Sequence, residues 1–311
     1  MNDFKKASSS RRGFLQRMGA IALLPLINVE SVFAEVDSSN RNAVLKVLTC
    51  NIRVDLPEDE QKGNGWSKRK EGCIQIIKRS KADIIGFQEV LKNQFLDLKK
   101  GLSDYYGIGF DGPEMDAHKE GYHGIAKNPI FFSKKRFELL NAGGYWLSEN
   151  PLEAGSISWE SARARNASWV RLLDKKTGKE FRLVNLHLDH VKDEAKLQQI
   201  KLVLKESAQY QSDFVQILTG DFNSGPDSAV IKEIMTAGWK DTFSVNNIVG
   251  KVEGTTHAFV PHDMERAKRA KKIDFIFTKG PVSFISAKII KDNWKGVYPS
   301  DHYFVDAEIT L

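Results

Sequence analysis

Residues 214–223 read Phe-Val-Gln-Ile-Leu-Thr-Gly-Asp-Phe-Asn. The first six residues are mainly aliphatic or β-branched, which is typical of a buried β-strand. The stretch then stops at a carboxylate, Asp221, and an amide, Asn223, and extended backbone would turn both side chains to one face across Phe222. Because the rigid end of a strand can hold polar groups in a fixed geometry, this stretch predicts part of a catalytic site.

Other predicted strands end in the same way. The strand from Val44 to Ile52 carries Asn51 at its end, and the strand 82–88 is followed directly by Glu89. The second strand of a hairpin ends at His187, with Asp189 on the same face two residues later. Three further polar positions complete the set, namely His257, Asp274 and the pair Asp301-His302.

The order of predicted elements indicates the fold class. Helices are expected at 66–80, 193–211 and 228–237, and strands at 44–52, 82–88, 105–110, 129–133, 168–173, 180–187, 214–219, 273–277, 285–291 and 303–311. Strands alternate with helices early and pair as hairpins later, which favours an α/β (α+β) chain with two mixed sheets packed together. In helix 66–80 we expect Trp66, Cys73 and Ile76 to face the core and Arg69 to face elsewhere.

Composition sets loose limits on function. The chain of 311 residues is 41% hydrophobic and 28% charged, as expected for a globular protein. Its formal net charge is +6, but residues 1–34 hold five basic and two acidic residues, so a chain cleaved after Ala34 carries only +3. Such a charge is weak support for a polyanionic partner.

The first 34 residues predict export. The run Ser10-Arg11-Arg12-Gly13-Phe14-Leu15-Gln16 resembles a twin-arginine signal, and an apolar stretch from Met18 to about Val29 leads to small residues suitable for cleavage after Ala34. Pro25 and Asn28 interrupt that stretch, which argues against a stable membrane anchor. We therefore expect a signal peptide at 1–34, a linker at 35–43, one domain at 44–311, and a periplasmic or secreted location.

The two cysteines, Cys50 and Cys73, are too few for a zinc-binding array. Both are interpreted as small buried hydrophobic residues, with a disulfide between them as the lesser alternative. The polar strand ends offer oxygen ligands instead, which suits Mg²⁺ or Mn²⁺. Glu89 is the leading candidate ligand.

Taken together and in order, these motifs resemble the endonuclease/exonuclease/phosphatase superfamily from Val44 to the C-terminus. The matching segments are Thr49-Cys50-Asn51, Gln88-Glu89, Asn185-Leu186-His187-Leu188-Asp189, Gly220-Asp221-Phe222-Asn223, Ile273-Asp274-Phe275-Ile276-Phe277 and Ser300-Asp301-His302. The resemblance implies a DNase I-like four-layer sandwich, in which two mixed β-sheets pack face to face, helices cover the outside, and the catalytic cleft lies along one edge.

The resemblance also implies roles for the site residues. Glu89 would bind the metal, with Asn51 and Asp301 nearby as direct or water-mediated ligands. Asp221 would orient or deprotonate the attacking water, and Asn223 would hold that water or the phosphoryl group. His302, charged by Asp274, would contact a phosphoryl oxygen. His187 would be a phosphate contact or the leaving-group acid, and Asp189 and Asn51 are further candidates for substrate contact.

Three positively charged features leave alternatives open. Arg53 stands where some relatives have an acidic residue, which argues against a second metal there. Arg165 is either a bidentate substrate-phosphate ligand or a solvated loop charge. The residues Arg266, Lys268, Arg269, Lys271 and Lys272 either place positive charge beside the cleft or form a solvated helix.

The sequence therefore predicts a divalent-metal-dependent hydrolase of phosphate esters. A phosphodiesterase or nuclease is favoured, with nucleic acid among the candidate substrates. The alternatives are a phosphomonoesterase of the inositol-phosphate or sugar-phosphate type, a lipid-headgroup phosphodiesterase, and an exported binding protein on the same fold. We expect the choice of substrate to depend on cleft loops such as residues 111–128.

Overall fold

The computed structural model describes residues 43–110, 121–243 and 253–311. The predicted signal peptide, nearly all of the predicted linker and part of the predicted cleft loop 111–128 lie outside these residues. Residues 1–38 form a separate unit, and the description below concerns the unit 39–311 alone. Among the described residues, no helix is both long enough and apolar enough to cross a membrane.

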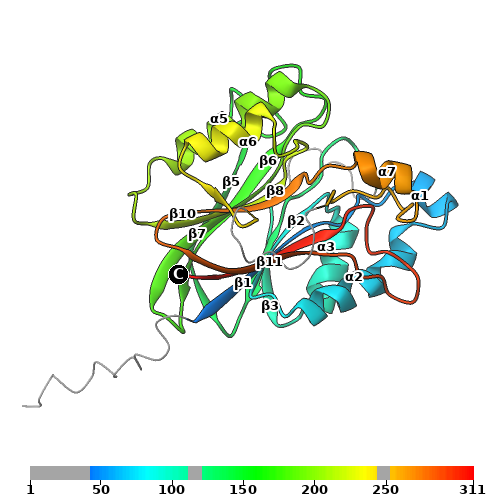
Figure 1. Ribbon diagram of the computed structural model, residues 1–311, viewed down its shortest axis with the longest axis horizontal. Helices are drawn as coiled ribbons and strands as arrows, with labels where there is room; N and C mark the ends of the chain where they lie inside the picture. The colour runs from blue at the N-terminus through cyan, green and yellow to red at the C-terminus, as the bar shows by residue number, and fades with distance from the viewer. Residues whose placement is uncertain (1–42, 111–120, 244–252) are drawn as a thin grey trace, which may run out of the picture. The chain divides into compact units, whose positions relative to one another are not determined.

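Two six-stranded mixed sheets form the centre of this unit (Figure 1). The first sheet has the order β11 (Ser283–Ile290), β12 (Phe304–Thr310), β1 (Val44–Asn51), β2 (Ile84–Gln88), β4 (Ile130–Ser133) and β3 (Tyr105–Ile108). The second has the order β5 (Phe137–Trp146), β6 (Asn166–Asp174), β7 (Lys179–His187), β8 (Val215–Asp221), β10 (Asp274–Lys279) and β9 (Lys240–Asp241).

Helices cover the outer face of each sheet. In Figure 1, α5 (Asp193–Ser207) and α6 (Ala229–Thr236) lie over the second sheet, and α2 (Trp66–Ser80) and α3 (Lys92–Gly101) lie over the first. The short helices α1 (Pro57–Gln61) and α7 (Met264–Arg269) lie in connections between strands and helices. The DNase I-like four-layer sandwich predicted from the sequence is confirmed.

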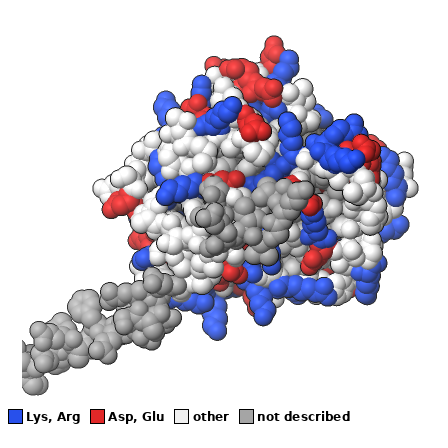
Figure 2. All heavy atoms as spheres, viewed as in Figure 1, with Lys and Arg blue, Asp and Glu red and all other residues white. Residues whose placement is uncertain are grey.

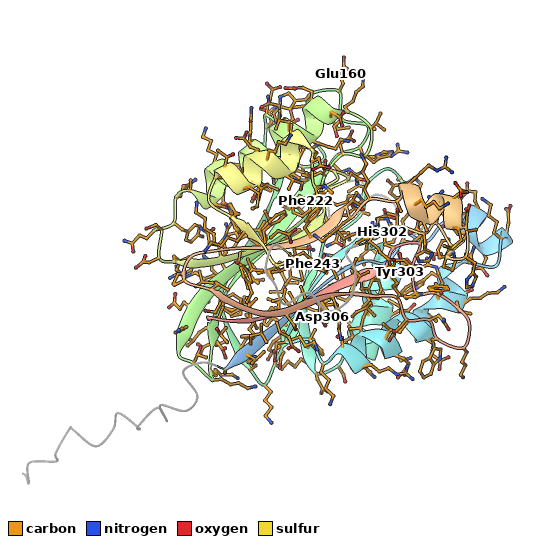
Figure 3. All side chains as sticks on the ribbon, viewed as in Figure 1. Glu160, Phe222, Phe243, His302, Tyr303 and Asp306 are labelled. Atoms are coloured by element: carbon orange, nitrogen blue, oxygen red, sulfur yellow. The ribbon has the colours of Figure 1, made fainter. Side chains whose placement is uncertain are left out.

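Three apolar clusters separate the four layers. Alternation along β1 shows how one strand contributes to two of them, because Leu45 and Val47 pack between the sheets whereas Leu48 and Cys50 pack under α2 and α3. The third cluster joins the second sheet to α5 and α6, and Phe222 belongs to it (Figure 3). Cys50 and Cys73 are free and buried in one cluster, as the first interpretation of the cysteines predicted.

A polar contact ties the two sheets together close to the edge that is predicted to hold the cleft. Asn185 on β7 accepts a hydrogen bond from Gln88 Nε2 at 2.6 Å and donates to the Phe87 carbonyl at 2.7 Å. Gly86 makes this approach possible, since a Cβ at that position would lie 2.4 Å from Asn185 Oδ1. The ends of β2 and β7 are therefore held at a fixed separation.

Candidate active site

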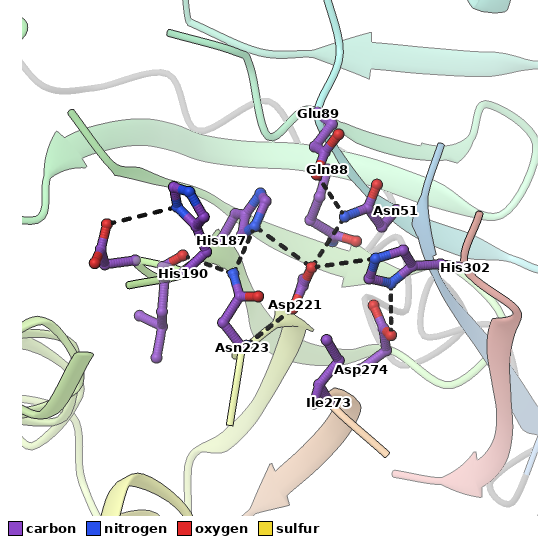
Figure 4. A network of polar contacts seen from close by, with 12 residues as sticks. Asn51, Gln88, Glu89, His187, His190, Asp221, Asn223, Ile273, Asp274 and His302 are labelled. Atoms are coloured by element: carbon purple, nitrogen blue, oxygen red, sulfur yellow. Dashed lines mark hydrogen bonds and ion pairs between the residues drawn. The ribbon is translucent and has the colours of Figure 1, made fainter. Parts of the chain in front are cut away.

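Strand register brings the predicted residues together. His187 at the end of β7 is paired with Asp221 at the end of β8, and Asp221 is paired in turn with Asp274 at the start of β10. On the other sheet, Asn51 is paired with Gln88, the residue before Glu89. The polar strand ends of both sheets thus meet at one edge of the sandwich (Figure 4).

Asp221 lies at the centre of the polar network (Figure 4). Its Oδ2 accepts a hydrogen bond from Asn51 Nδ2 at 2.9 Å and lies 3.4 Å from His187 Nε2 and 3.9 Å from His302 Nε2. Its Oδ1 accepts from the backbone N–H of Asn223 at 2.9 Å. Burial, together with the neighbouring charge of Asp274, raises the pKa of Asp221 to about 7. A carboxylate with a pKa near neutrality is suited to orient or deprotonate a water molecule.

The backbone around Asn223 differs from the prediction. Asn223 has φ of 47° and is therefore in the left-handed region, not in an extended strand. Its side chain still turns towards the site, because Nδ2 donates to His187 Nε2 at 2.9 Å and to the Leu188 carbonyl at 3.1 Å. The two side chains converge as expected, but through a tight turn in which Asp221 caps the Asn223 N–H.

The two histidines of the candidate site, His187 and His302, have opposite electrostatic environments. His302 donates from Nδ1 to Asp274 at 3.0 Å, and although burial opposes its charge, the carboxylates of Asp274, Asp221 and Asp301 raise its pKa well above the ordinary value. Burial and the positive charge of Arg165 lower the pKa of His187 well below the ordinary value. His302 is therefore the cationic imidazole and His187 the neutral one, which favours hydrogen bonding over proton donation by His187.

The carboxylate predicted to bind a metal is fixed by its neighbours. Glu89 Oε1 accepts from Asn51 Nδ2 at 3.0 Å, and Oε2 accepts from the Val54 N–H at 2.9 Å. Asn51, predicted as a direct or water-mediated ligand, accepts from the Arg53 N–H at Oδ1, while its amide nitrogen bridges Glu89 and Asp221. Asn51 Nδ2 thus lies between the carboxylates of Glu89 and Asp221 and donates a hydrogen bond to each.

The donor set suits a hard divalent cation. One ligand atom from each of Glu89, His187 and Asp221 lies within 4.8 Å of the others. Each carboxylate oxygen keeps a free lone pair after its single hydrogen bond. Asp301 lines the same cavity as Glu89 and Asp221, and Arg53 Nη1 lies 3.7 Å from Asp301 Oδ2. Arg53 therefore places a positive charge beside Asp301, at the position where the sequence argued against a second metal ion.

A cavity of about 330 Å³ opens over this network. The predicted strand-end residues supply one side of it, and a second side comes mainly from loops, of which only residues 111–128 were predicted from the sequence as a cleft loop. That second side includes Tyr122, Ala126, Asn128, Arg163, Asn166 and His190. His190 could have been found from its place directly after Asp189, whereas Tyr122 and Asn128 lie in the predicted cleft loop 111–128 but were not singled out within it.

Arg165 belongs to this cavity and is not a solvated loop charge. One guanidinium nitrogen, Nη2, lies 3.1 Å from His190 Nδ1, and Nε is buried with no hydrogen-bond partner among the described residues. Burial lowers the pKa of Arg165, with partial compensation from nearby negative groups that include Glu89 and Asp221. The position supports the first of the two predicted roles, contact with substrate phosphate.

Asn51 and Asp274 belong to the network around Asp221 without lining the cavity, and three further predicted positions are buried elsewhere. Asp189 is fully buried and accepts hydrogen bonds from Ser161 Oγ, from the Ala162 N–H, and from the N–H groups of Val191 and Lys192, so its oxygens are occupied by the protein. The prediction of a substrate contact by Asp189 is therefore corrected to a structural role. His257 stacks on Tyr303 at 4.4 Å, and its backbone N–H donates to the Asp301 carbonyl at 2.8 Å.

The third is Lys272, which is buried beside Asp241 at 3.3 Å with its Nζ 3.3 Å from the Phe275 ring centroid. It cannot hold a substrate anion. The basic residues Arg266, Lys268 and Arg269 form the exposed side of α7, as the solvated-helix alternative predicted, and Figure 2 shows Lys and Arg gathered there. Lys268 and Lys271 line a separate hollow of about 730 Å³ beside Gly225.

The fold and the site define a class of protein. A model of the Endonuclease/Exonuclease/phosphatase family matches residues 48–302, so the chain belongs to this family and is a hydrolase of phosphate esters. Members of the family typically use a divalent metal ion, in agreement with the groups of carboxylates and histidines described above.

Three individual proteins are similar to this chain. An endonuclease/exonuclease/phosphatase from Bacteroides vulgatus is 34% identical with a TM-score of 0.77, over 86% of this chain and 99% of its own. The mannosyl-6-phosphatase of Bacteroides thetaiotaomicron is 27% identical with a TM-score of 0.76, over 86% of this chain and 100% of its own. An uncharacterized protein of Acanthamoeba polyphaga mimivirus is 29% identical over 58% of this chain and 67% of its own length.

Proposed function

We propose that the chain hydrolyses small phosphate monoesters, with sugar phosphates as the leading substrate class, and that it requires Mg²⁺ or Mn²⁺. The cavity carries this proposal. Its volume of about 330 Å³ lies at the lower end of the ~300–1,000 Å³ typical of small-molecule sites. A terminal phosphate is largely dianionic at neutral pH, and the three arginines Arg53, Arg163 and Arg165 line the cavity. The similarity to a mannosyl-6-phosphatase adds support.

In the proposed reaction, Asp221 orients the attacking water and Asn223 holds it against the phosphorus. His302, kept cationic by Asp274 at 3.0 Å, stabilises negative charge on a phosphoryl oxygen, and Arg165 binds a second oxygen. His187, neutral and hydrogen-bonded to Asn223, fixes the amide that positions the water. Arg163 and Tyr122, which also line the cavity, are proposed to contact the leaving group.

The bound cation would polarise the phosphoryl group and offset its charge. Glu89 and Asp301 are the carboxylates proposed to hold it, with Asp221 within reach and Asn51 keeping Glu89 and Asp221 apart. Water and substrate oxygens would complete the ligand set, as is usual for Mg²⁺.

The first experiment compares phosphate release from mannose 6-phosphate, glucose 6-phosphate and 4-nitrophenyl phosphate with hydrolysis of bis(4-nitrophenyl) phosphate. Each substrate is tested with Mn²⁺, with Mg²⁺ and with EDTA. We expect kcat/KM for a sugar phosphate to exceed that for the diester at least tenfold, and EDTA to abolish both reactions. A preference for the diester would overturn the monoester proposal, and activity that survives EDTA would overturn the metal requirement.

The second candidate is the nuclease favoured by the sequence. The hollow beside α7 supports it, because Lys268 and Lys271 line it beside Asp227 and Glu253, and Asn223 of the candidate site is only two residues from Gly225. Cleavage of an oligonucleotide that is weakened by Lys268→Gln/Lys271→Gln, with sugar-phosphate activity unchanged, would favour this candidate. If the protein hydrolysed none of these substrates, the exported binding protein would remain as the alternative.

We also propose export through the twin-arginine route, on the sequence of residues 10–16. The pair Arg11 and Arg12 provides the test. Replacing both with lysine keeps the charge, and we expect it to retain the protein in the cytoplasm, measured by cell fractionation with a cytoplasmic marker. Unchanged export of the double variant would contradict this route.

A further inference from the structure

Arg69 on α2 is fully buried, although the sequence predicted that it faces away from the core. Among the described residues no carboxylate pairs with it. Its hydrogen bonds go instead to backbone carbonyls, from Nε to Asn64 at 2.6 Å, from Nη1 to Ile52 at 2.6 Å and to Pro299 at 2.8 Å, and from Nη2 to Arg53 at 3.2 Å. A buried charge without a counter-charge is costly, so this position needs an explanation.

Two of these carbonyls, those of Ile52 and Arg53, belong to the segment that holds Glu89. Ile52 directly follows Asn51, whose amide bonds Glu89, and Val54 donates its N–H to the other Glu89 oxygen. Arg53 has φ of 60°, and Gln94 Nε2 donates to the same Arg53 carbonyl at 2.9 Å. The guanidinium thus fixes the turn that presents two hydrogen-bond donors to Glu89.

The Pro299 carbonyl belongs to the opposite side of the proposed metal site. Pro299 lies two residues before Asp301, and Ser300 between them bonds Asp301 Oδ1 and the His302 N–H through its hydroxyl. The ring of Phe259 lies 5.5 Å from the Arg69 guanidinium, in the loop where Ala258 donates its N–H to the Asp301 carbonyl. Arg69 therefore contacts segments next to both Glu89 and Asp301 while touching neither.

We propose that Arg69 is a positioning residue for the metal ion, because its planar fork holds the 52–53 and 299–302 segments at the separation that places Glu89 and Asp301 around one cation. The inference rests on the proposed function, which assigns the cation to these carboxylates. Lysine cannot replace the fork, since its ammonium has three donors around one point and the carbonyls come from separate segments.

The test measures Mn²⁺ binding in the absence of substrate, by the EPR signal of free Mn²⁺, together with thermal unfolding of each variant. We expect Arg69→Lys to raise the Kd for Mn²⁺ by about 10- to 100-fold, as is typical when the groups supporting metal ligands are changed. At saturating Mn²⁺, kcat should recover towards the wild-type value, because the residues that contact substrate are intact.

Arg182 supplies the matched control. It is also a fully buried arginine, but it lies on β7 under α5, where its Nη2 bonds Glu206 at 2.6 Å and its guanidinium stacks on Trp169 and Tyr210. Arg182→Lys should lower stability without changing the Kd for Mn²⁺. If Arg182→Lys weakened Mn²⁺ binding as much as Arg69→Lys, the effect would be general destabilisation and the proposal would be overturned.

Phe259→Leu keeps the test decisive if Arg69→Lys does not fold. Phe259 is only half-buried, and leucine removes the ring beside the guanidinium while every carbonyl contact remains possible. We expect a several-fold rise in the Kd for Mn²⁺ in this variant. Wild-type Kd values in Phe259→Leu and in folded Arg69→Lys would overturn the positioning role, whereas absence of Mn²⁺ binding by the wild-type protein would instead overturn the proposed metal site.

Discussion

His302 is held between two carboxylates, with Nδ1 bonded to Asp274 at 3.0 Å and Nε2 facing Asp221 at 3.9 Å. Asp274 Oδ1 has no hydrogen-bond partner among the described residues, so the carboxylate acts mainly on the histidine. This arrangement keeps the imidazole oriented and charged without exposing it to bulk water.

Replacing Asp274 with asparagine should remove the largest influence that raises the His302 pKa. The pKa of His302 would fall and with it the charged fraction of the imidazole, and we expect kcat to fall about 100-fold, within the range typical of acid–base and electrostatic groups. Turnover and the His302 titration, followed by NMR, measure the effect. Because Asp274 acts through His302, the double variant Asp274→Asn/His302→Ala should be no slower than His302→Ala; additive losses would assign Asp274 a separate role.

Glu89→Gln tests the metal site itself. Glutamine keeps the size of the side chain and an oxygen for the Val54 N–H, but it removes the negative charge proposed to hold the cation. We expect Mn²⁺ binding to weaken by about 100-fold and activity to fall with it. Isothermal titration with Mn²⁺ gives the affinity. If the affinity for Mn²⁺ were unchanged in Glu89→Gln, Glu89 would not be a metal ligand, and the other carboxylates of the cluster would be assigned that role instead.

Asp189 should matter for stability more than for chemistry. It joins the segment 161–162 to the start of α5 through four hydrogen bonds, which lower its pKa although burial opposes the charge. We expect Asp189→Asn to lower the free energy of unfolding by ~2 kcal/mol, since a charged acceptor is lost while the N–H groups stay buried. Urea unfolding measures this. If Asp189→Asn had normal stability but had lost turnover, Asp189 would have a role in the reaction after all.

The strand ends were predictable from the sequence because periodicity and polar termination are local signals. The strands that end at Asn51 and His187, and the helix 66–80, appear where expected. Strand β5, at Phe137–Trp146, was missed since it is an edge strand, mostly half-buried or exposed, and contains Gly143 and Gly144. Its sequence therefore lacks the alternation of a strand with one buried face.

The second side of the cavity was not predictable in the same way. Tyr122, Asn128 and Arg163 come from loops whose approach to the site depends on the packing of both sheets, and the sequence carries no period that records it. Arg69 illustrates the same limit, because its helical position is compatible with solvent until the loops at 52–53 and 299 are placed over it. The second side of the cavity and the burial of Arg69 both depend on tertiary contacts.

Asp306 lies on β12, outside the candidate active site, and should make the stability of the protein depend on pH (Figure 3). It is buried, Oδ2 lacks a hydrogen bond among the described residues, and the nearest cation is Lys46 Nζ at 3.6 Å. Burial raises its pKa to about 6. Between about pH 4 and 6 the folded state therefore binds more protons at Asp306 than the unfolded state does. Stability should fall as the pH rises through this window, and the whole loss from this residue is ~3 kcal/mol.

Asp306→Asn should remove this titration. We expect the variant to be more stable than the wild-type protein at pH 7.5 by up to ~3 kcal/mol, with the difference disappearing near pH 4, because the wild-type carboxyl is then neutral. Urea unfolding at several pH values measures it. Glu308→Gln is the matched control, since Glu308 contacts the same Lys46 at 3.2 Å from a more exposed position, and such a pair is worth at most ~1 kcal/mol. A destabilised Asp306→Asn at pH 7.5 would show that the pair with Lys46 outweighs the cost of burying the charge.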